Sequence, residues 1–210
     1  TAWSVPAGLI ATAEISTRQP GVVAGVPVVR EVFAQTDPEV WVETLVADGT
    51  RVPAGAVLAR LTGPACSLIT GERTALNFLQ RLCGIATVTD QFVQAVAGTK
   101  TQIRDTRKTA PGLRALDKYA VTAGGGGNYR LSLAEMVLLK ENHIAAAGGV
   151  TAAIEAVRRG MAESGTSVPV DVEVQTVAQA REAMAAGAGW LMLDNMDALS
   201  AGVAWIASAG

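Results

Sequence analysis

The feature that most constrains the fold is a regular alternation of short apolar strands and helical stretches after residue 100. Strands are predicted over residues 101–105, 136–139, 168–174 and 190–193. The spacing of apolar residues predicts helices over residues 112–120, 150–163, 177–186 and 197–208. Such alternation predicts parallel strands joined by helical crossovers.

Each of these strands ends at a charged residue. Arg107 and Lys108 follow the first strand, Lys140 follows the second, Glu173 closes the third and Asp194 follows the fourth. In a (β/α) barrel the carboxyl ends of the strands carry the active site. The alternative is that a charge only marks the point where a buried strand meets solvent, but four in succession favour a site. Four strands cannot close a barrel, so we expect an open sheet or a missing C-terminal part.

The first seventy residues have a different pattern. Apolar and β-branched segments separated by Gly, Pro and Asp-Gly turns predict strands over residues 9–16, 21–29, 40–46 and 56–61. Helical spacing begins at Glu72 and extends to a C-cap at Gly98. We therefore expect a domain boundary near residue 75, with an N-terminal domain over residues 1–75 and a second domain over residues 76–210.

Charge is distributed unevenly along the chain. The formal net charge is −2, yet residues 100–140 hold eight Lys or Arg against three acids. A nucleic-acid-binding domain usually has a pI above about 9 and aromatic side chains for stacking, whereas this chain has a pI of about 5.5 and 4% aromatic residues. The sequence therefore predicts a pocket for a small anion and no nucleic-acid partner.

Cysteine usage and hydropathy restrict the cellular context. Cys66 and Cys83 are the only cysteines, too few for a disulfide framework or a Cys-based metal site, so both are expected in the core. The chain opens on no signal-like segment, and no apolar run approaches the roughly 18 residues of a membrane span. These features predict a cytoplasmic protein with no membrane partner and no resident metal.

The stretch "TRKTAPGLRALDKYAVTAGGGGNYR", residues 106–130, gathers five cationic side chains around one acid. A guanidinium meets a carboxylate or phosphate through two parallel hydrogen bonds, and an ammonium is a compact charge suited to pyrophosphate oxygens. The glycine run at residues 124–127 is expected to offer backbone N–H groups to a ligand. A flexible linker is the alternative interpretation of the same glycines.

Several motifs, in this order and spacing, resemble the quinolinate phosphoribosyltransferase family. They are "RQPGVVAG", "GERTALNFLQRLCGIAT", "DTRKTAPGLR", the glycine run closing on Arg130, "LLKENHI", "DVEV" and "MLDN". The resemblance covers essentially the whole chain. It implies an α/β protein with an N-terminal α/β sandwich followed by an incomplete (β/α) barrel, assembled as a homodimer with shared active sites. It also implies that quinolinate and phosphoribosyl pyrophosphate react, with Mg²⁺, to nicotinate mononucleotide, pyrophosphate and CO₂ in NAD biosynthesis.

The resemblance also implies roles for particular residues. Arg73 would reach the partner's site and, with Arg107 and Arg130, bind the two carboxylates of quinolinate. Lys108 and Lys140 would neutralise anionic groups, with Lys140 close to the transferring pyrophosphate. The carboxylates of Glu173 and Asp194 would hold the ribose hydroxyls or the Mg²⁺ that accompanies the pyrophosphate.

Two departures from the family pattern leave alternatives open. Tyr129 stands where the family usually has a histidine, which leaves room for a different aromatic acid as substrate. The family's chain also begins with a helix before Thr1 and continues beyond "MLDN" to a glycine-rich phosphate site, so we expect a truncated chain. A homologue that binds an anion without catalysis is the remaining alternative. His143, the only histidine, is expected to be structural, capping the loop after the second strand.

Overall fold

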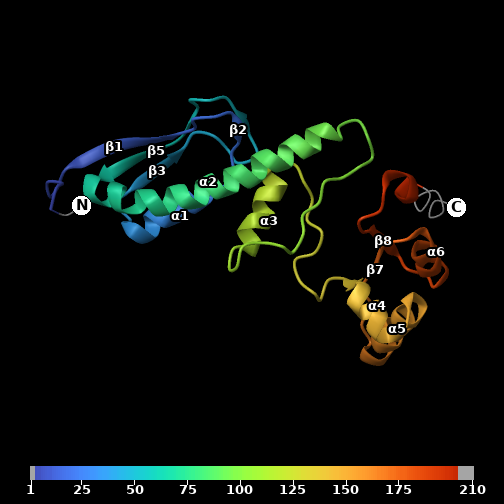
Figure 1. Ribbon diagram of the computed structural model, residues 1–210. Helices are drawn as coiled ribbons and strands as arrows, with labels where there is room; N and C mark the ends of the chain where they lie inside the picture. The colour runs from blue at the N-terminus through green and yellow to red at the C-terminus, as the bar shows by residue number, and fades with distance from the viewer. Residues whose placement is uncertain (1–2, 203–210) are drawn as a thin grey trace. The chain divides into compact units, whose positions relative to one another are not determined.

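The structure is a computed structural model that describes residues 3–202 of the chain. The chain divides into two compact units, Thr1–Leu131 and Ser132–Gly210 (Figure 1). This division differs from the domains predicted from the sequence, because one helix, α2 (Ala65–Ala95), passes through residue 75. A division by contacts does not show which part of the chain folds on its own. The domain boundary near residue 75 therefore stays a prediction.

The first unit is built on an antiparallel sheet with the strand order β1-β5-β3. These strands are β1 (Ile10–Ser16), β5 (Val57–Pro64) and β3 (Trp41–Thr44), and they confirm three of the four strands predicted before residue 70. A second, two-stranded sheet pairs β2 (Gly21–Val22) with β4 (Arg51–Val52). The buried faces of the sheets and of α1 and α2 form the core around Val29, Phe33, Leu58, Leu61 and Leu79.

The strand predicted over residues 21–29 is wrong beyond Val22. The segment leaves the sheet and forms helix α1 (Val26–Thr36), with Pro27 in its first turn and Gly25 at φ 104° before it. The first N–H groups of α1 are satisfied from a distance, because the Asp48 carboxylate accepts hydrogen bonds from the N–H groups of Gly25 at 2.6 Å and Val26 at 3.2 Å. Valines favour strands in isolation, but proline in a first turn and a distant cap favour the helix.

α2 begins seven residues before the predicted start at Glu72. It follows Pro64 directly and buries one stripe of apolar residues, Leu68, Ala75, Leu79, Leu82 and Ala86. Its later turns contact α3 (Arg114–Ala123). The strand predicted over residues 101–105 is wrong as a regular strand, because the segment forms a single parallel bridge between Arg104 and Gly127.

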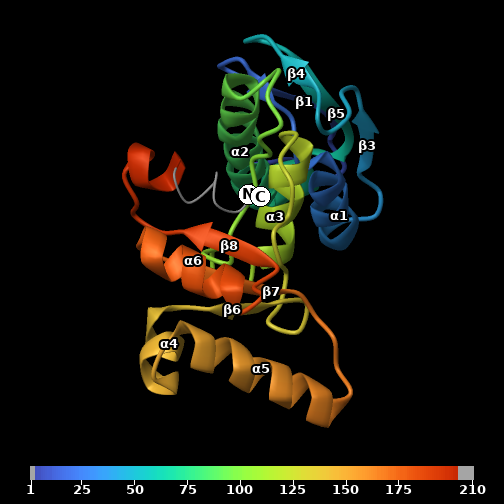
Figure 2. The same ribbon diagram turned by 90° about the vertical axis from the view of Figure 1, so that its right-hand side faces the viewer.

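The second unit contains a parallel sheet with the strand order β6-β7-β8. Its strands are β6 (Val137–Leu139), β7 (Val170–Val174) and β8 (Trp190–Leu193), and its helices are α4 (Glu141–Ala147), α5 (Val150–Ser164) and α6 (Val177–Ala185). Figure 2 shows the three strands side by side with these helices beside them. The alternation predicted from the sequence is confirmed, although α4 was not predicted. The helix predicted over residues 197–208 is present at residues 198–202, and its remainder lies outside the described residues.

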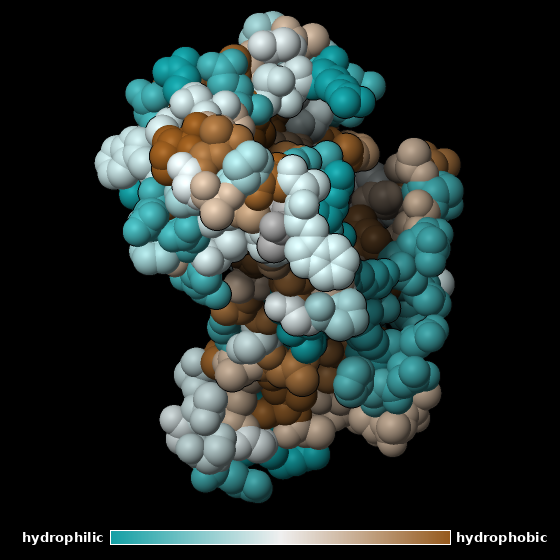
Figure 3. All heavy atoms as spheres, turned by 90° about the vertical axis from the view of Figure 1, so that its left-hand side faces the viewer, coloured by the Kyte–Doolittle hydropathy of each residue, from teal (hydrophilic) through white to brown (hydrophobic). Residues whose placement is uncertain are grey.

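Several large apolar side chains remain exposed on the first unit. Ile10, Ile69 and Phe92 are 61%, 49% and 59% exposed. Hydrophobic atoms are visible between hydrophilic ones on the face drawn in Figure 3. These side chains are spread over the unit, with Ile69 and Phe92 twenty-three residues apart on α2.

Candidate functional site

Arg107 lies in the loop that follows the bridge at Arg104. Its side chain is half-buried, and its Nε is buried without a hydrogen-bond acceptor in the described part of the chain. A buried donor without an acceptor costs free energy, on the order of 1–3 kcal/mol. Lys108 is exposed beside it, and its N–H donates to the Thr106 hydroxyl at 3.0 Å. The loop therefore holds a guanidinium that is ready for an anion.

Arg130 ends the neighbouring segment, and its side chain is only 7% exposed. The guanidinium carbon of Arg130 lies 5.9 Å from the centre of the Tyr129 ring. Because Arg104 and Gly127 form a parallel bridge, Arg107 and Arg130 each follow the bridging pair by three residues on neighbouring segments. The structure thus brings together the segments that carry Arg107, Lys108, Tyr129 and Arg130.

The glycine run does not act as predicted. The N–H groups of Gly124, Gly125, Gly126 and Gly127 donate to the carbonyls of Ala120, Thr122, Val121 and Ile103, so none is left for a ligand. A Cβ on Gly126 would lie 2.8 Å from methyl groups of both Thr89 and Val121. A Cβ on Gly124 would collide with the Ala86 carbonyl oxygen of α2. The glycines therefore permit close packing on α2 and α3, and the linker interpretation is equally wrong.

Two buried carboxylates, which the sequence analysis did not assign, anchor these loops. Asp105 forms an ion pair with Lys118, with 2.6 Å between Oδ1 and Nζ. Asp117 accepts two hydrogen bonds from Arg81, at 2.8 and 2.7 Å, and one from the Ala110 N–H at 3.1 Å. The hydrogen bonds from Arg81 lower the pKa of Asp117. Lys118 therefore binds an internal carboxylate, contrary to the prediction that the cationic cluster serves a ligand.

A sequence signal for these anchors does exist. In α3, Asp117 follows Leu113 by four residues and precedes Ala120 by three, so it lies on the apolar face of the helix. A charged residue on an apolar helix face requires a buried partner. The sequence does not identify the partners, because they are distant along the chain. Arg81 lies 36 residues from Asp117, and Asp105 lies 13 residues from Lys118.

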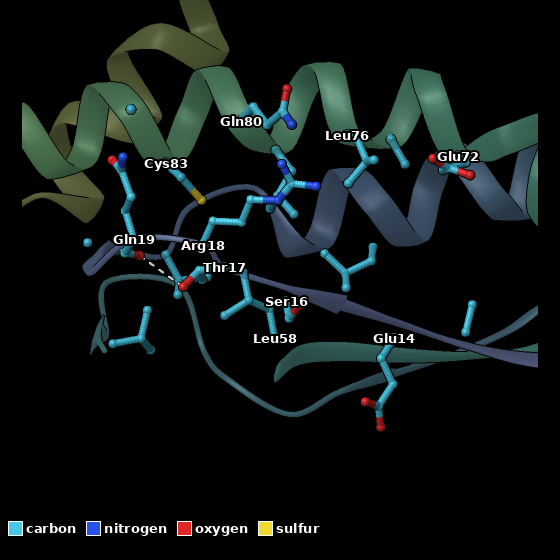
Figure 4. Close-up of a pocket in the computed structure, with 18 of the residues that line it drawn as sticks. Glu14, Ser16, Thr17, Arg18, Gln19, Leu58, Glu72, Leu76, Gln80 and Cys83 are labelled. Atoms are coloured by element: carbon cyan, nitrogen blue, oxygen red, sulfur yellow. Dashed lines mark hydrogen bonds between the residues drawn. The ribbon is translucent and has the colours of Figure 1, made fainter. Parts of the chain in front are cut away.

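Arg73 is exposed on α2, eight residues after the helix begins. Arg73 lines a cavity of about 1080 Å³ between β1 and α2. In Figure 4, Arg18 extends from the segment after β1 toward α2, where Gln80 and Cys83 lie. The cavity is lined by five leucines and by charged residues of both signs, Arg18 and Arg73 with Glu14 and Glu72.

Lys140 and Glu173 form an ion pair at the carboxyl ends of β6 and β7. The Lys140 Nζ lies 2.8 Å from the Glu173 Oε2, with the lysine side chain 45% exposed and the glutamate 13%. Glu173, a polar residue in β7, therefore has Lys140 as its partner. Glu173 also lines a small cavity of about 200 Å³ with Glu141, Gln175 and Gln179.

Asp194 lies at the carboxyl end of β8 and accepts hydrogen bonds from the side chains of Gln175, at 3.3 Å, and Asn195, at 3.1 Å. Asn195 has a φ of 52°, uncommon for a residue other than glycine. The helical turns that follow are capped by Asp197, which accepts from the N–H groups of Leu199 and Ser200. Asp194 therefore does not cap these turns. Lys140, Glu173 and Asp194 end three adjacent parallel strands.

His143 has the capping role predicted for it. Its Nδ1 accepts a hydrogen bond from the Lys140 N–H at 3.1 Å, at the start of α4. Cys66 and Cys83 are free thiols of intermediate burial, and burial raises the pKa of the Cys83 thiol. Within residues 3–202, no group of three or more His, Cys, Asp or Glu side chains could hold a metal ion. No helix among these residues is both long and apolar enough for a transmembrane segment.

Models of known protein families match nearly the whole chain. The N-terminal domain of quinolinate phosphoribosyl transferase matches residues 1–83, and its C-terminal domain matches residues 85–206. The chain belongs to the quinolinate phosphoribosyltransferase family. The two family domains meet close to residue 84, within α2 and nine residues from the boundary predicted from the sequence.

Individual relatives agree with the family models. A nicotinate-nucleotide pyrophosphorylase (carboxylating) of Mycobacterium leprae is 45% identical over 199 residues, which cover 93% of this chain and 68% of that protein. A probable enzyme of the same name from Bacillus subtilis is 44% identical over 183 residues, 87% of this chain and 62% of the relative. This chain therefore spans less than two thirds of the Bacillus relative.

A solved structure confirms the fold. The nicotinate-nucleotide pyrophosphorylase from Ehrlichia chaffeensis superimposes with a TM-score of 0.93 at 36% identity, covering 100% of this chain and 74% of that one. The fold class predicted from the sequence, an N-terminal α/β sandwich followed by an incomplete (β/α) barrel, is therefore confirmed. The family, however, does not by itself assign a role to any residue of this chain.

Proposed function

We propose that the protein transfers the phosphoribosyl group of phosphoribosyl pyrophosphate to quinolinate, with decarboxylation, in NAD biosynthesis. The products are nicotinate mononucleotide, pyrophosphate and CO₂. The observation that carries this proposal is the buried Nε of Arg107, which has no acceptor among the described residues of a chain from this family. A carboxylate of the substrate would supply that acceptor.

The diacid is bound by the cationic segments of the first unit. Arg107 and Arg130 bind the two carboxylates of quinolinate, since a guanidinium matches a carboxylate through two hydrogen bonds. Lys108 adds an exposed positive charge, and the Tyr129 ring packs beside Arg130. Because an ordinary tyrosine stays uncharged near neutral pH, the arginines and Lys108 supply the charge here.

The transfer step uses the carboxyl ends of β6, β7 and β8. Departure of pyrophosphate leaves positive charge on the ribose ring, as in glycosyl transfer generally, so anions beside the ring and cations beside the leaving group both stabilise the transition state. Glu173 and Asp194 supply the carboxylates, and Lys140 supplies the cation. The Lys140–Glu173 ion pair is compatible with both roles, since the exposed lysine is able to turn toward a more highly charged pyrophosphate.

Decarboxylation requires no further residue of the protein. Bond formation between the ribose and the pyridine nitrogen makes that nitrogen cationic. The ring then accepts the electron pair left when CO₂ departs from C2, and a proton takes its place. The two arginines hold the ring in one orientation throughout, and the C2 carboxylate is the one that leaves because C2 adjoins the cationic nitrogen.

Mg²⁺ fits this site as an ion that arrives with the substrate. Glu173 and Asp194 provide two carboxylates on adjacent strands, and the residues described contain no third acidic or imidazole ligand beside them. One or two carboxylates plus substrate phosphates is the usual Mg²⁺ environment. When bound, the ion would neutralise charge on the departing pyrophosphate.

We also propose that the enzyme is a cytoplasmic homodimer with shared active sites. Arg73 is exposed at the rim of a cavity and has no assigned task within its own unit, which fits a residue that serves the partner subunit. The exposed apolar side chains of the first unit fit an interface. Two free thiols fit a reducing compartment.

The binding of the diacid is tested with Arg107→Ala. Loss of a charged hydrogen-bond partner costs about 1.5–3 kcal/mol, so the Kd for quinolinate rises about 10- to 100-fold, measured by titration calorimetry. Lys100→Ala, which removes an exposed charge that precedes this loop, is the matched control and leaves the Kd within about twofold. Equal affinity in wild type and Arg107→Ala would contradict the assignment.

A further inference from the structure

The buried pair of Asp105 and Lys118 lies between the two segments that carry the acid-binding arginines. The two side chains are 6% and 3% exposed, and 2.6 Å separates their charged atoms. A fully buried ion pair is weak evidence for stability, because well-packed apolar residues in its place are often as stable or more so. Stability alone therefore does not explain this ion pair, and its other contacts indicate a further role.

The Asp105 carboxylate holds the segment before Arg130. Its Oδ1, besides pairing with Lys118, accepts a hydrogen bond from the Tyr129 N–H at 2.8 Å. With its amide oriented to suit its neighbours, Asn128 donates to Asp105 Oδ2 at 2.8 Å and to the Lys118 carbonyl at 3.1 Å. The residue directly before Arg130 is thus fixed by Asp105, and Asn128 is fixed by both members of the pair.

The backbone of Asp105 also binds the segment before Arg130, at Gly127. Its N–H donates to the Gly127 carbonyl at 3.1 Å, and the Gly127 N–H donates to the Ile103 carbonyl at 2.8 Å. Asp105 precedes Arg107 by two residues. One residue therefore ties the start of the Arg107 loop to the three residues before Arg130.

We propose that Asp105 and Lys118 are positioning residues that set the spacing of Arg107 and Arg130, and so select a 1,2-dicarboxylate over a monocarboxylate. This role rests on the quinolinate transfer proposed above. Lys118 acts through Asp105, since it holds the carboxylate in the orientation that receives the Tyr129 N–H. Neither residue touches the substrate. A monocarboxylate needs only one guanidinium and is insensitive to the spacing, whereas a dicarboxylate needs both at a fixed separation.

The test compares two ligands in Lys118→Met, which keeps an unbranched side chain one atom shorter and removes its charge. By titration calorimetry on the whole purified protein, the Kd for quinolinate rises at least tenfold, and the Kd for nicotinate changes less than about threefold. A role in folding alone would lower the number of binding sites per chain and leave the Kd ratio of the two ligands unchanged. An unchanged ratio in Lys118→Met would therefore overturn the positioning role.

A matched control separates stability from positioning. Val29→Ala opens a cavity in the core of the first unit, at a residue with 0% exposure that does not contact the acid-binding segments. It lowers the melting temperature and leaves both Kd values unchanged. If Lys118→Met does not fold, Asp105→Asn provides the same comparison, because it keeps an oxygen for the Tyr129 N–H and loses the charge.

The outcome for wild type separates this inference from the proposed function. A wild-type protein that binds quinolinate no better than nicotinate contradicts the proposed substrate, and the positioning role fails with it. A wild type that prefers quinolinate, with the same preference in both variants, contradicts the positioning role alone.

Discussion

At the scale of single residues, Tyr129 determines whether the proposed acid site has an ionisable ring beside Arg130 that could become cationic. The residue lies directly before the buried Arg130, with its N–H bound to Asp105 and its ring 5.9 Å from the guanidinium carbon of Arg130. A histidine in this place would gain a positive charge below its ordinary pKa of about 6.5, which a tyrosine does not. Tyr129 therefore places a phenol, and not an imidazole, beside Arg130.

Tyr129→His introduces a pH dependence that the wild type lacks. As the pH falls from 7.5 to 5.5 the imidazole becomes cationic beside a dianionic ligand, so we expect quinolinate affinity to rise about three- to tenfold in the variant. Titration calorimetry at both pH values measures this. Tyr129→Phe serves as the control and shows no more change than wild type. A variant whose affinity does not change with pH would show that position 129 does not face the acid.

At the scale of elements, the contact of the glycine run with α2 and α3 is the packing feature on which the Arg130 segment depends. Gly124 and Gly126 leave no room for a side chain, and their N–H groups are bound by carbonyls of α3. A side chain at Gly124 would meet the Ala86 carbonyl of α2, and one at Gly126 would meet methyl groups of Thr89 and Val121. The effect is therefore expected on stability first.

Gly126→Ala should destabilise the protein by about 1–3 kcal/mol, the usual cost of forcing a methyl group into a filled space. The melting temperature from circular dichroism should fall by several degrees. Gly84→Ala is the matched control, because a Cβ at this position in α2 would meet no atom within 4 Å. There alanine stabilises the helix by up to about 1 kcal/mol. Equal effects of the two substitutions would show that the contact at Gly126 is not tight.

Asp117 connects α2, α3 and the Arg107 loop, and its contribution depends on pH. Its pKa is lowered by hydrogen bonds from Arg81, so its stabilising effect is complete above the ordinary value of about 3.9 and is lost as the pH falls through the folded-state pKa. We expect Asp117→Asn to lower the free energy of unfolding by about 1–3 kcal/mol at pH 7. The difference from wild type should shrink below pH 4.

Urea unfolding at pH 7 and pH 3 tests this dependence. Asp90→Asn is a suitable comparison, because the pKa of Asp90 is also lowered by hydrogen bonds from an arginine, Arg51, but that arginine is 61% exposed. Exposed pairs contribute little, so its difference from wild type should be the smaller one. A difference for Asp117→Asn that is the same at both pH values would mean that its charge contributes nothing.

The sequence predicts the elements better than it predicts the contacts between them. Apolar spacing identified α5, α6 and the strands β6 to β8, because parallel strands between helices have a local signature. The same reasoning took Val26 to Val29 for a strand, since the cap of α1 comes from Asp48, twenty-two residues beyond Val26. It also assigned the four glycines to a ligand, because the packing partners in α2 are distant in sequence. Long-range partners, as for Lys118 and Asp105, are what local patterns cannot supply.

At the scale of the whole molecule, the proposed function requires that residues from two subunits act on one substrate pair. Arg73→Ala and Lys140→Ala are each expected to be inactive alone. Mixed and allowed to exchange subunits, they should regain about a quarter of wild-type activity, since about half of the dimers are mixed and each mixed dimer has one intact site. Glu173→Ala mixed with Lys140→Ala is the control and regains none, because Lys140 and Glu173 pair with each other within one subunit. Recovery in the control, or none in the first mixture, would contradict shared sites.

The most direct test of the account is ³¹P NMR of phosphoribosyl pyrophosphate and Mg²⁺ with the purified protein and, in separate samples, quinolinate, nicotinate or benzoate. Of the three acids, only quinolinate is expected to cause release of pyrophosphate. Each pyrophosphate released should be matched by one CO₂ and one nicotinate mononucleotide. Release with nicotinate or benzoate but not quinolinate would contradict the proposed substrate. Tight quinolinate binding without any release would show an anion-binding protein in place of an enzyme.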